Sequence, residues 1–189
     1  MAITRLGGAN AISGTIPQGN IANASLGAVT ALPAAITTGK VLQVVNSDNS
    51  YATDITSTTT TDVASSSGVT WEPTITPSST SSKIIVSVNL MAKSSAGVAD
   101  TRSRIDIYYK IGSGSYTSLS NNQMYSLYDY GGSGVSFSYR QPFQYLITPS
   151  STSAITIKFT CSSINASCTT EVNPSGVSAN SSCILYEVA

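Results

Sequence analysis

The chain has 189 residues, and only 10% of them are charged, against about 25% in ordinary soluble domains. Hydroxyl groups must supply much of the surface polarity, because the sequence contains 34 serines and 23 threonines. Nine Lys and Arg residues balance nine Asp and Glu residues, and the chain has no histidine. The balanced charge argues against nucleic-acid binding. The missing histidine excludes Ser-His-Asp and Cys-His catalysis and imidazole zinc sites in this chain.

This composition predicts an all-β protein. Thr is β-branched and favours strands, whereas Ser, Asn and Gly favour turns and oppose helix formation. No stretch approaches the roughly 20 apolar residues of a membrane span, and the first residues do not resemble a signal peptide. The three cysteines, at 161, 168 and 183, match neither a secreted disulfide framework nor a metal-site spacing. We therefore expect a protein made in the cytoplasm that does not insert into a membrane.

The region 1–39 differs from the rest of the chain in charge, since no charged residue stands between Arg5 and Lys40. Aliphatic side chains recur there every three to five positions, and Gly and Pro between them interrupt any long helix. Such a segment is too apolar to remain a solvated linker. We expect an arm that docks on a partner or intertwines with its own copies. Its anchors are Ile12, Ile16, Ile21, Leu26, Val29, Leu32 and Ile36.

In the region 40–189, apolar runs alternate with turn residues about every ten positions, which is typical of a β-sandwich. Residues 40–46 predict a buried strand, and 69–75 predict a strand in which Pro73 marks an edge or a bulge. Period-two alternation predicts further strands over 82–92, 105–111 and 155–161. A closing strand is expected over 182–188, and weaker ones over 51–57, 116–127 and 135–147. About eight strands suit a jelly-roll-like antiparallel β-sandwich better than a closed barrel.

Tyrosine is unevenly distributed, since eight of the ten lie between positions 108 and 145. The stretch 121–134 mixes Tyr with Ser, Gly and Asn, as antibody paratopes do, and this chemistry also suits contact with sugar rings. Two interpretations stay open. The side chains form a receptor surface, or they fill the sandwich or a subunit interface. The residues concerned are Asn121, Asn122, Tyr125, Tyr128 and Tyr130.

Arg102, Arg104 and Asp106 share one face of a predicted strand. The two arginines repel each other unless an acid such as Asp100 or Asp129 neutralises them at a subunit interface. The alternative is a solvated sheet face, where charges contribute little to stability. The nine carboxylates show no spacing that marks glycoside hydrolysis. We therefore predict no catalytic residues, no metal site and no cofactor.

Four segments of the sequence are distinctive. They are LPAAITTGKVLQVV (32–45), the Thr/Ser-rich stretch 57–61, ITPSSTSSKIIVSVNLMA (75–92) and SSCILYEVA (181–189). Together they resemble tail-fibre-type virion proteins of bacteriophages, especially marine and cyanobacterial phages. The resemblance implies a non-enzymatic virion protein that forms a symmetric oligomer, with a homotrimer expected, and displays a β-sandwich from an N-terminal arm.

The chain is shorter than many such fibres, which leaves two functions open. One is a short fibre, attached to the particle by residues 1–39, whose domain 40–189 contacts the host surface and its glycans. The other is a capsid decoration protein, a cement protein or head fibre that stabilises the shell through other virion proteins. In both cases we expect a component of the virion that is assembled in the host cytoplasm.

Overall fold

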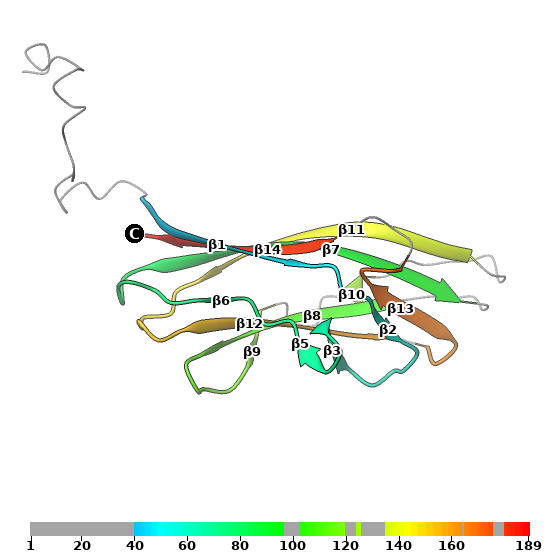
Figure 1. The fold of residues 1–189 in the computed structure, drawn as a ribbon. Coiled ribbons are helices and arrows are strands. Elements are labelled where there is room, and N and C mark those ends of the chain that lie inside the picture. Colours follow the sequence, from blue (N-terminus) through cyan, green and yellow to red (C-terminus); the bar gives the residue numbers. More distant parts are fainter. Residues whose placement is uncertain (1–39, 97–102, 120–123, 126–134, 164, 176–179) are drawn as a thin grey trace, which may run out of the picture. The chain divides into compact units, whose positions relative to one another are not determined.

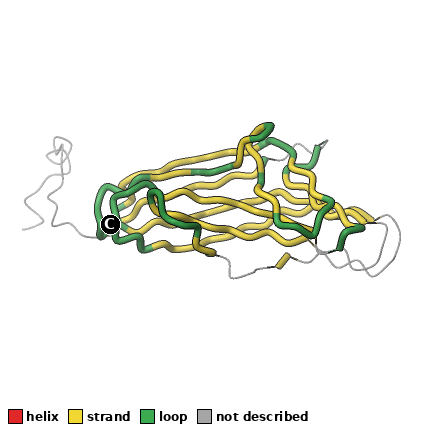
Figure 2. Tube along the Cα trace, turned by 90° about the horizontal axis from the view of Figure 1, so that it is seen from below, coloured by secondary structure: helices red, strands yellow, loops and turns green. Residues whose placement is uncertain are grey.

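The computed structural model describes residues 40–96, 103–119, 124–125, 135–163, 165–175 and 180–189. These residues form strands, turns and loops, with no helix among them (Figure 2). Most strands lie in two antiparallel sheets that face each other, with β1, β14, β7 and β11 in one layer and β8 and β12 in the other (Figure 1). The predicted all-β, jelly-roll-like sandwich is therefore confirmed. The proposed arm 1–39 lies outside the described residues and stays a prediction.

The first sheet is built around β7 (Lys83–Ala96). One edge of β7 pairs with β11 (Val135–Ile147) from Ile84 onward. Its other edge is shared, because β14 (Ser181–Val188) pairs with the first half of β7 and β13 (Cys168–Val172) with the second half. Two further strands extend the sheet at this edge, β1 (Val41–Asn49) beyond β14 and β2 (Thr53–Ile55) beyond β13.

The second sheet is built around β12 (Ile155–Ser163), which pairs along its whole length with β8 (Ser103–Ile111). Four short strands complete this sheet. Two of them pair with β12, namely β3 (Thr61–Asp62) and β6 (Thr74–Ile75). The other two pair with β8, namely β9 (Thr117–Ser118) and β10 (Met124–Tyr125). A separate hairpin joins β4 (Ala64–Ser66) to β5 (Val69–Thr70).

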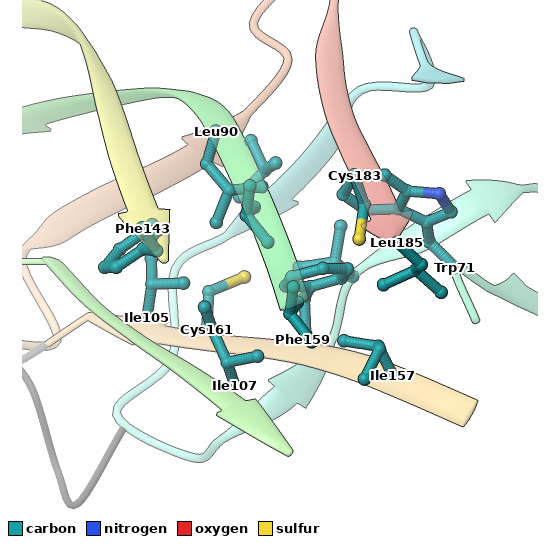
Figure 3. Close-up of a cluster of buried hydrophobic side chains, with 14 of the residues drawn as sticks. Trp71, Leu90, Ile105, Ile107, Phe143, Ile157, Phe159, Cys161, Cys183 and Leu185 are labelled. Carbon is teal, nitrogen blue, oxygen red and sulfur yellow. The ribbon is translucent and has the colours of Figure 1, made fainter. Parts of the chain in front are cut away.

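The hydrophobic core lies between the two sheets, where alternate side chains of β7, β8, β12 and β14 meet (Figure 3). Trp71 and Phe159 stack at its centre, with ring centroids 4.4 Å apart and an angle of 27° between the planes. The indole Nε1 of Trp71 donates a hydrogen bond to the Ser47 hydroxyl at 3.0 Å. The core therefore satisfies the one polar atom of its largest aromatic side chain.

The strongest strand predictions, those with clear period-two alternation, are confirmed. The prediction that residues 40–46 form a buried strand is half wrong. They do form a strand, but Val41, Leu42 and Val44 are 56%, 45% and 55% exposed. β1 is the last strand at its edge of the sheet, where Val45 packs against the core while Val44 faces away from it. Val41 and Leu42 lie at an irregularity in the pairing of β1 with β14. As expected, Pro73 interrupts pairing, and its carbonyl accepts a hydrogen bond from the Ile157 N–H instead.

The expected number of strands was about eight, whereas the described residues contain fourteen. Most of the extra strands, such as β3 and β4, are two or three residues long. A segment that short cannot display a period of two, so sequence alternation does not reveal it.

Candidate functional site

Most of the contact residues predicted from the sequence lie outside the described residues. These are the arm anchors Ile12, Ile16, Ile21, Leu26, Val29, Leu32 and Ile36, together with Arg102, Asn121, Asn122, Tyr128 and Tyr130. Tyr125 belongs to the short strand β10, where it pairs in register with Ser103. The roles of all these residues stay predictions.

Two of the predicted interface charges, Arg104 and Asp106, are neighbours on one face of β8. The Arg104 Nε donates to the Asp106 Oδ2 at 2.6 Å, and the Asp106 side chain is buried. The other carboxylate oxygen, Oδ1, is also buried and has no hydrogen-bond partner among the described residues. Across the sheet, Asp106 pairs in register with Thr160, whose buried hydroxyl likewise lacks a partner there. Two unsatisfied polar atoms therefore belong to adjacent strands.

A cluster that the sequence analysis did not single out lies on the outer face of the second sheet. The Tyr116 hydroxyl donates to the Glu72 Oε1 at 2.6 Å. The ammonium groups of Lys110 and Lys158 lie 4.6 and 4.5 Å from the centroid of the Tyr116 ring. Lys158 also pairs with Asp62 at 3.1 Å, and Lys110 pairs with Glu72 at 3.9 Å. Two ammonium groups and two carboxylates thus surround one aromatic ring, with a formal charge of zero.

The environment of Tyr116 also fixes its protonation state. Burial raises the pKa of the Tyr116 hydroxyl, and the hydrogen bond to Glu72 together with the charge of that carboxylate raises it further. The phenol therefore stays protonated and continues to donate to Glu72 across the physiological pH range.

Two hollows open beside this cluster. We call the cluster and the two hollows together the Tyr116 site. One has a volume of about 290 Å³ and is lined by Thr60, Asp62, Tyr108, Tyr116, Lys158 and Thr160. The other has a volume of about 450 Å³ and is lined by Thr60, Thr61, Asp62, Ala64, Gly68, Val69 and Thr70. Thr60 and Asp62 line both hollows, so the two lie next to each other along β3 and the β4–β5 hairpin, and we call the pair the depression.

The outer face of the first sheet carries one row of apolar side chains. Strand register places Val44 beside Tyr186, Tyr186 beside Ile85, and Ile85 beside Leu146. We call these four side chains the apolar row, which crosses β1, β14, β7 and β11. Leu146 is 58% exposed. A hollow of about 320 Å³ lies at the β11 end of the row and is lined by Ile85, Gln144, Tyr145 and Leu146.

The three cysteines are buried, and no disulfide joins them. Burial raises the pKa of the Cys183 thiol to about 12, so this group stays protonated and weakly reactive. In the described part of the chain, no group of three or more His, Cys, Asp or Glu side chains lies close enough to hold a metal ion. That part also contains no helix of the length and apolarity needed to cross a membrane.

Comparison with known proteins gives only a partial structural overlap. No protein-family model and no curated protein matches the chain. Among solved structures, it is similar to the T13 IBDV viral particle, with 16% identity and a TM-score of 0.40 over 77% of this chain and 35% of that one. It is also similar to the infectious bursal disease virus VP2 subviral particle, with 14% identity and a TM-score of 0.40 over 77% and 36%. The chain spans about a third of the length of these proteins, so its function is argued from its own residues.

Proposed function

We propose that this chain is a structural protein of a virus particle, which acts by assembling with its own copies and with other virion proteins. The observation that carries the proposal is the apolar row on the outer face of the first sheet. Contiguous exposed apolar patches, when they are large, mark sites of interaction with other proteins. The sequence resemblance to phage fibre proteins supports a virion as the assembly in which this surface is used.

We assign other copies of this chain as the occupants of this face. The next row across the same four strands is also uncharged and consists of Asn46, Ile184, Ser87 and Gln144. On this side, identical faces can meet without burying an unpaired charge, which would be costly. On the other side of the apolar row lies the exposed Lys83, which pairs in register with Val188. The homotrimer implied by the sequence resemblance would bring three such faces together around one axis.

Two positions of the protein on the particle are open. As a short fibre, it would be held to the particle by residues 1–39 while the sandwich contacts the host surface. As a capsid decoration protein, it would be spread over the shell and clamp neighbouring subunits. The apolar row fits both arrangements, because each requires copies of this chain to associate.

The test is the number and location of copies on purified particles, measured by quantitative gel analysis and by antibody labelling of intact virions. A few copies at the tail would support the short fibre. Hundreds of copies over the head would support the decoration protein. The absence of the protein from purified particles would overturn the proposal.

A further inference from the structure

We infer that the Tyr116 site binds a neutral saccharide chain along the two hollows that share Thr60 and Asp62. The inference rests on the proposed function for one point only, that the saccharide belongs to a host-surface glycan. The expected chemistry of the ligand is argued from the residues of the Tyr116 site alone.

The charges around the site favour a ligand without net charge. Each lysine is already paired with a carboxylate, Lys158 with Asp62 and Lys110 with Glu72. Of these four charged residues, only Asp62 and Lys158 line the hollows. An anionic ligand would meet the Asp62 carboxylate, and a cationic ligand would meet the Lys158 ammonium group. A polyhydroxylated neutral ligand can instead donate to a carboxylate and accept from an ammonium group, and hydrogen bonds to charged partners are the stronger ones.

The lining of the smaller hollow combines aromatic and polar groups, as ligand sites generally do. Tyr108 offers ring surface for the apolar C–H groups of a sugar. The Asp62 side chain is 44% exposed, so its carboxylate can accept hydrogen bonds from sugar hydroxyls. Thr60 adds a further hydroxyl at the junction with the second hollow.

An unsatisfied hydroxyl at the Tyr116 site supports the inference independently. Thr160 is only 4% exposed and lines the smaller hollow, yet its Oγ1 has no hydrogen-bond partner among the described residues. A buried polar atom without a partner destabilises the fold, so it calls for an explanation. The Oγ1 atom is not accessible to solvent in this structure, so a ligand hydroxyl in the hollow would supply the missing hydrogen bond once the Thr160 side chain rotates toward the hollow.

The shape of the depression favours a chain of sugars over a single ring. The larger hollow continues from Thr60 and Asp62 to the β4–β5 hairpin, where Thr61 and Thr70 provide further hydroxyl groups. A ligand that occupied both hollows would contact β3, β12 and the hairpin at once. Affinity should therefore increase with the number of sugar units until both hollows are filled.

The experiment uses the purified full-length protein and two matched panels of oligosaccharides. One panel contains neutral chains of glucose, galactose, mannose and N-acetylglucosamine, and the other carries uronic or sialic acid. The strongest neutral binder is then titrated by calorimetry against Asp62→Asn and Thr160→Val. Asp48→Asn and the exposed Thr148→Val are the matched controls, because both positions lie outside the linings of the two hollows.

We expect neutral chains to bind, both site variants to weaken binding about tenfold, and both controls to bind as wild type. Thr160→Val should also keep or raise the melting temperature, because it removes an unsatisfied buried hydroxyl. If Thr160 had a purely structural role, Thr160→Val would not weaken saccharide binding while it kept or raised the melting temperature.

Binding of acidic saccharides alone, binding of no neutral saccharide up to millimolar concentration, or unchanged binding by both site variants would overturn the inference. Incorporation into particles is measured separately. Failure of the saccharide site is therefore distinguishable from failure of the virion proposal.

Discussion

At the residue scale, Glu187 is a carboxylate in an unusual place, on the inward face of β14 and only 1% exposed. Its Oε1 accepts hydrogen bonds from the backbone N–H and the hydroxyl of Ser78, both at 2.6 Å. Burial alone would raise its pKa, but hydrogen bonds from the Ser78 side chain and from the backbone N–H groups of Ser78 and Ser79 lower it below its ordinary value. Glu187 therefore ties the turn that precedes β7 to the last strand.

Replacing this carboxylate by an amide, Glu187→Gln, should destabilise the fold by about 1 to 3 kcal/mol at about pH 7. Because the folded-state pKa is depressed, the ionised group contributes stability above its ordinary pKa of 4.5 and loses that contribution as the pH falls through the folded value. Urea unfolding from about pH 7 to about pH 2 should show the difference between wild type and variant shrinking in acid. An equal difference at both ends of this range would show that the charge of Glu187 does not stabilise the fold.

At the scale of the elements, the long strands were predictable and the polar ones were not. β7, β8, β12 and β14 show apolar residues at every second position, which indicates one buried face. The sequence pattern predicts no strand for β13, because its five residues, CTTEV, are mostly polar.

The residues of β13 are nonetheless buried, because hydroxyl groups satisfy one another between the sheets. The Thr170 Oγ1 donates to the Ser103 hydroxyl at 2.8 Å and lies 3.0 Å from the Ser163 hydroxyl. Ser94 also hydrogen-bonds to Ser103. This network links β7 and β13 of the first sheet to β8 and β12 of the second. No hydropathy pattern can reveal it, since each member looks like a surface residue in the sequence.

The Tyr116 site was missed for a different reason. Lys110 and Lys158 lie on the polar faces of their strands, opposite the buried isoleucines, as period-two alternation predicts. Glu72 and Tyr116, however, come from loops that lie far from each other in the sequence. The contact between Glu72 and Tyr116 depends on the path of those loops over the second sheet. The alternation of apolar and polar residues along a strand carries no information about that path.

The stack of Trp71 on Phe159 gives a direct test of the core. Phe159→Ala should destabilise the fold by about 3 to 5 kcal/mol, because it removes a fully buried ring and leaves a cavity against the indole. The chain has a single tryptophan, so its fluorescence during denaturant unfolding reports on this stack alone. The exposed Tyr51→Ala should change stability by no more than about 0.5 kcal/mol. Equal effects of the two substitutions would contradict the assigned core.

At the scale of the whole molecule, the two outer faces of the sandwich divide the surface chemistry between them. The first sheet presents the apolar row, which is suited to association with other copies. The second sheet presents the paired charges, hydroxyls and rings of the Tyr116 site. An oligomer that buried the first face would leave the second face accessible to solvent on each subunit.

The apolar row should therefore control assembly. Leu146→Asp places a charge in the row, and we expect it to convert the oligomer into folded monomers, as measured by size-exclusion chromatography with light scattering. The matched control is Val69→Asp, because Val69 is 53% exposed but lies on the β4–β5 hairpin. The control should keep the wild-type mass. A monomeric wild type, or a Leu146→Asp variant with the wild-type mass, would contradict the assembly face.

The pairing of β1 with β14 has a consequence for the order in which the chain can fold. β14 lies between β1 and β7, although it leaves the ribosome after both of them. Until it inserts, β1 has no neighbour in the sheet and half of one edge of β7 remains open. Open strand edges pair readily with other chains, and such non-local pairing is slow to form. Nascent copies on neighbouring ribosomes therefore have a long interval in which one can lend its C-terminal strand to another.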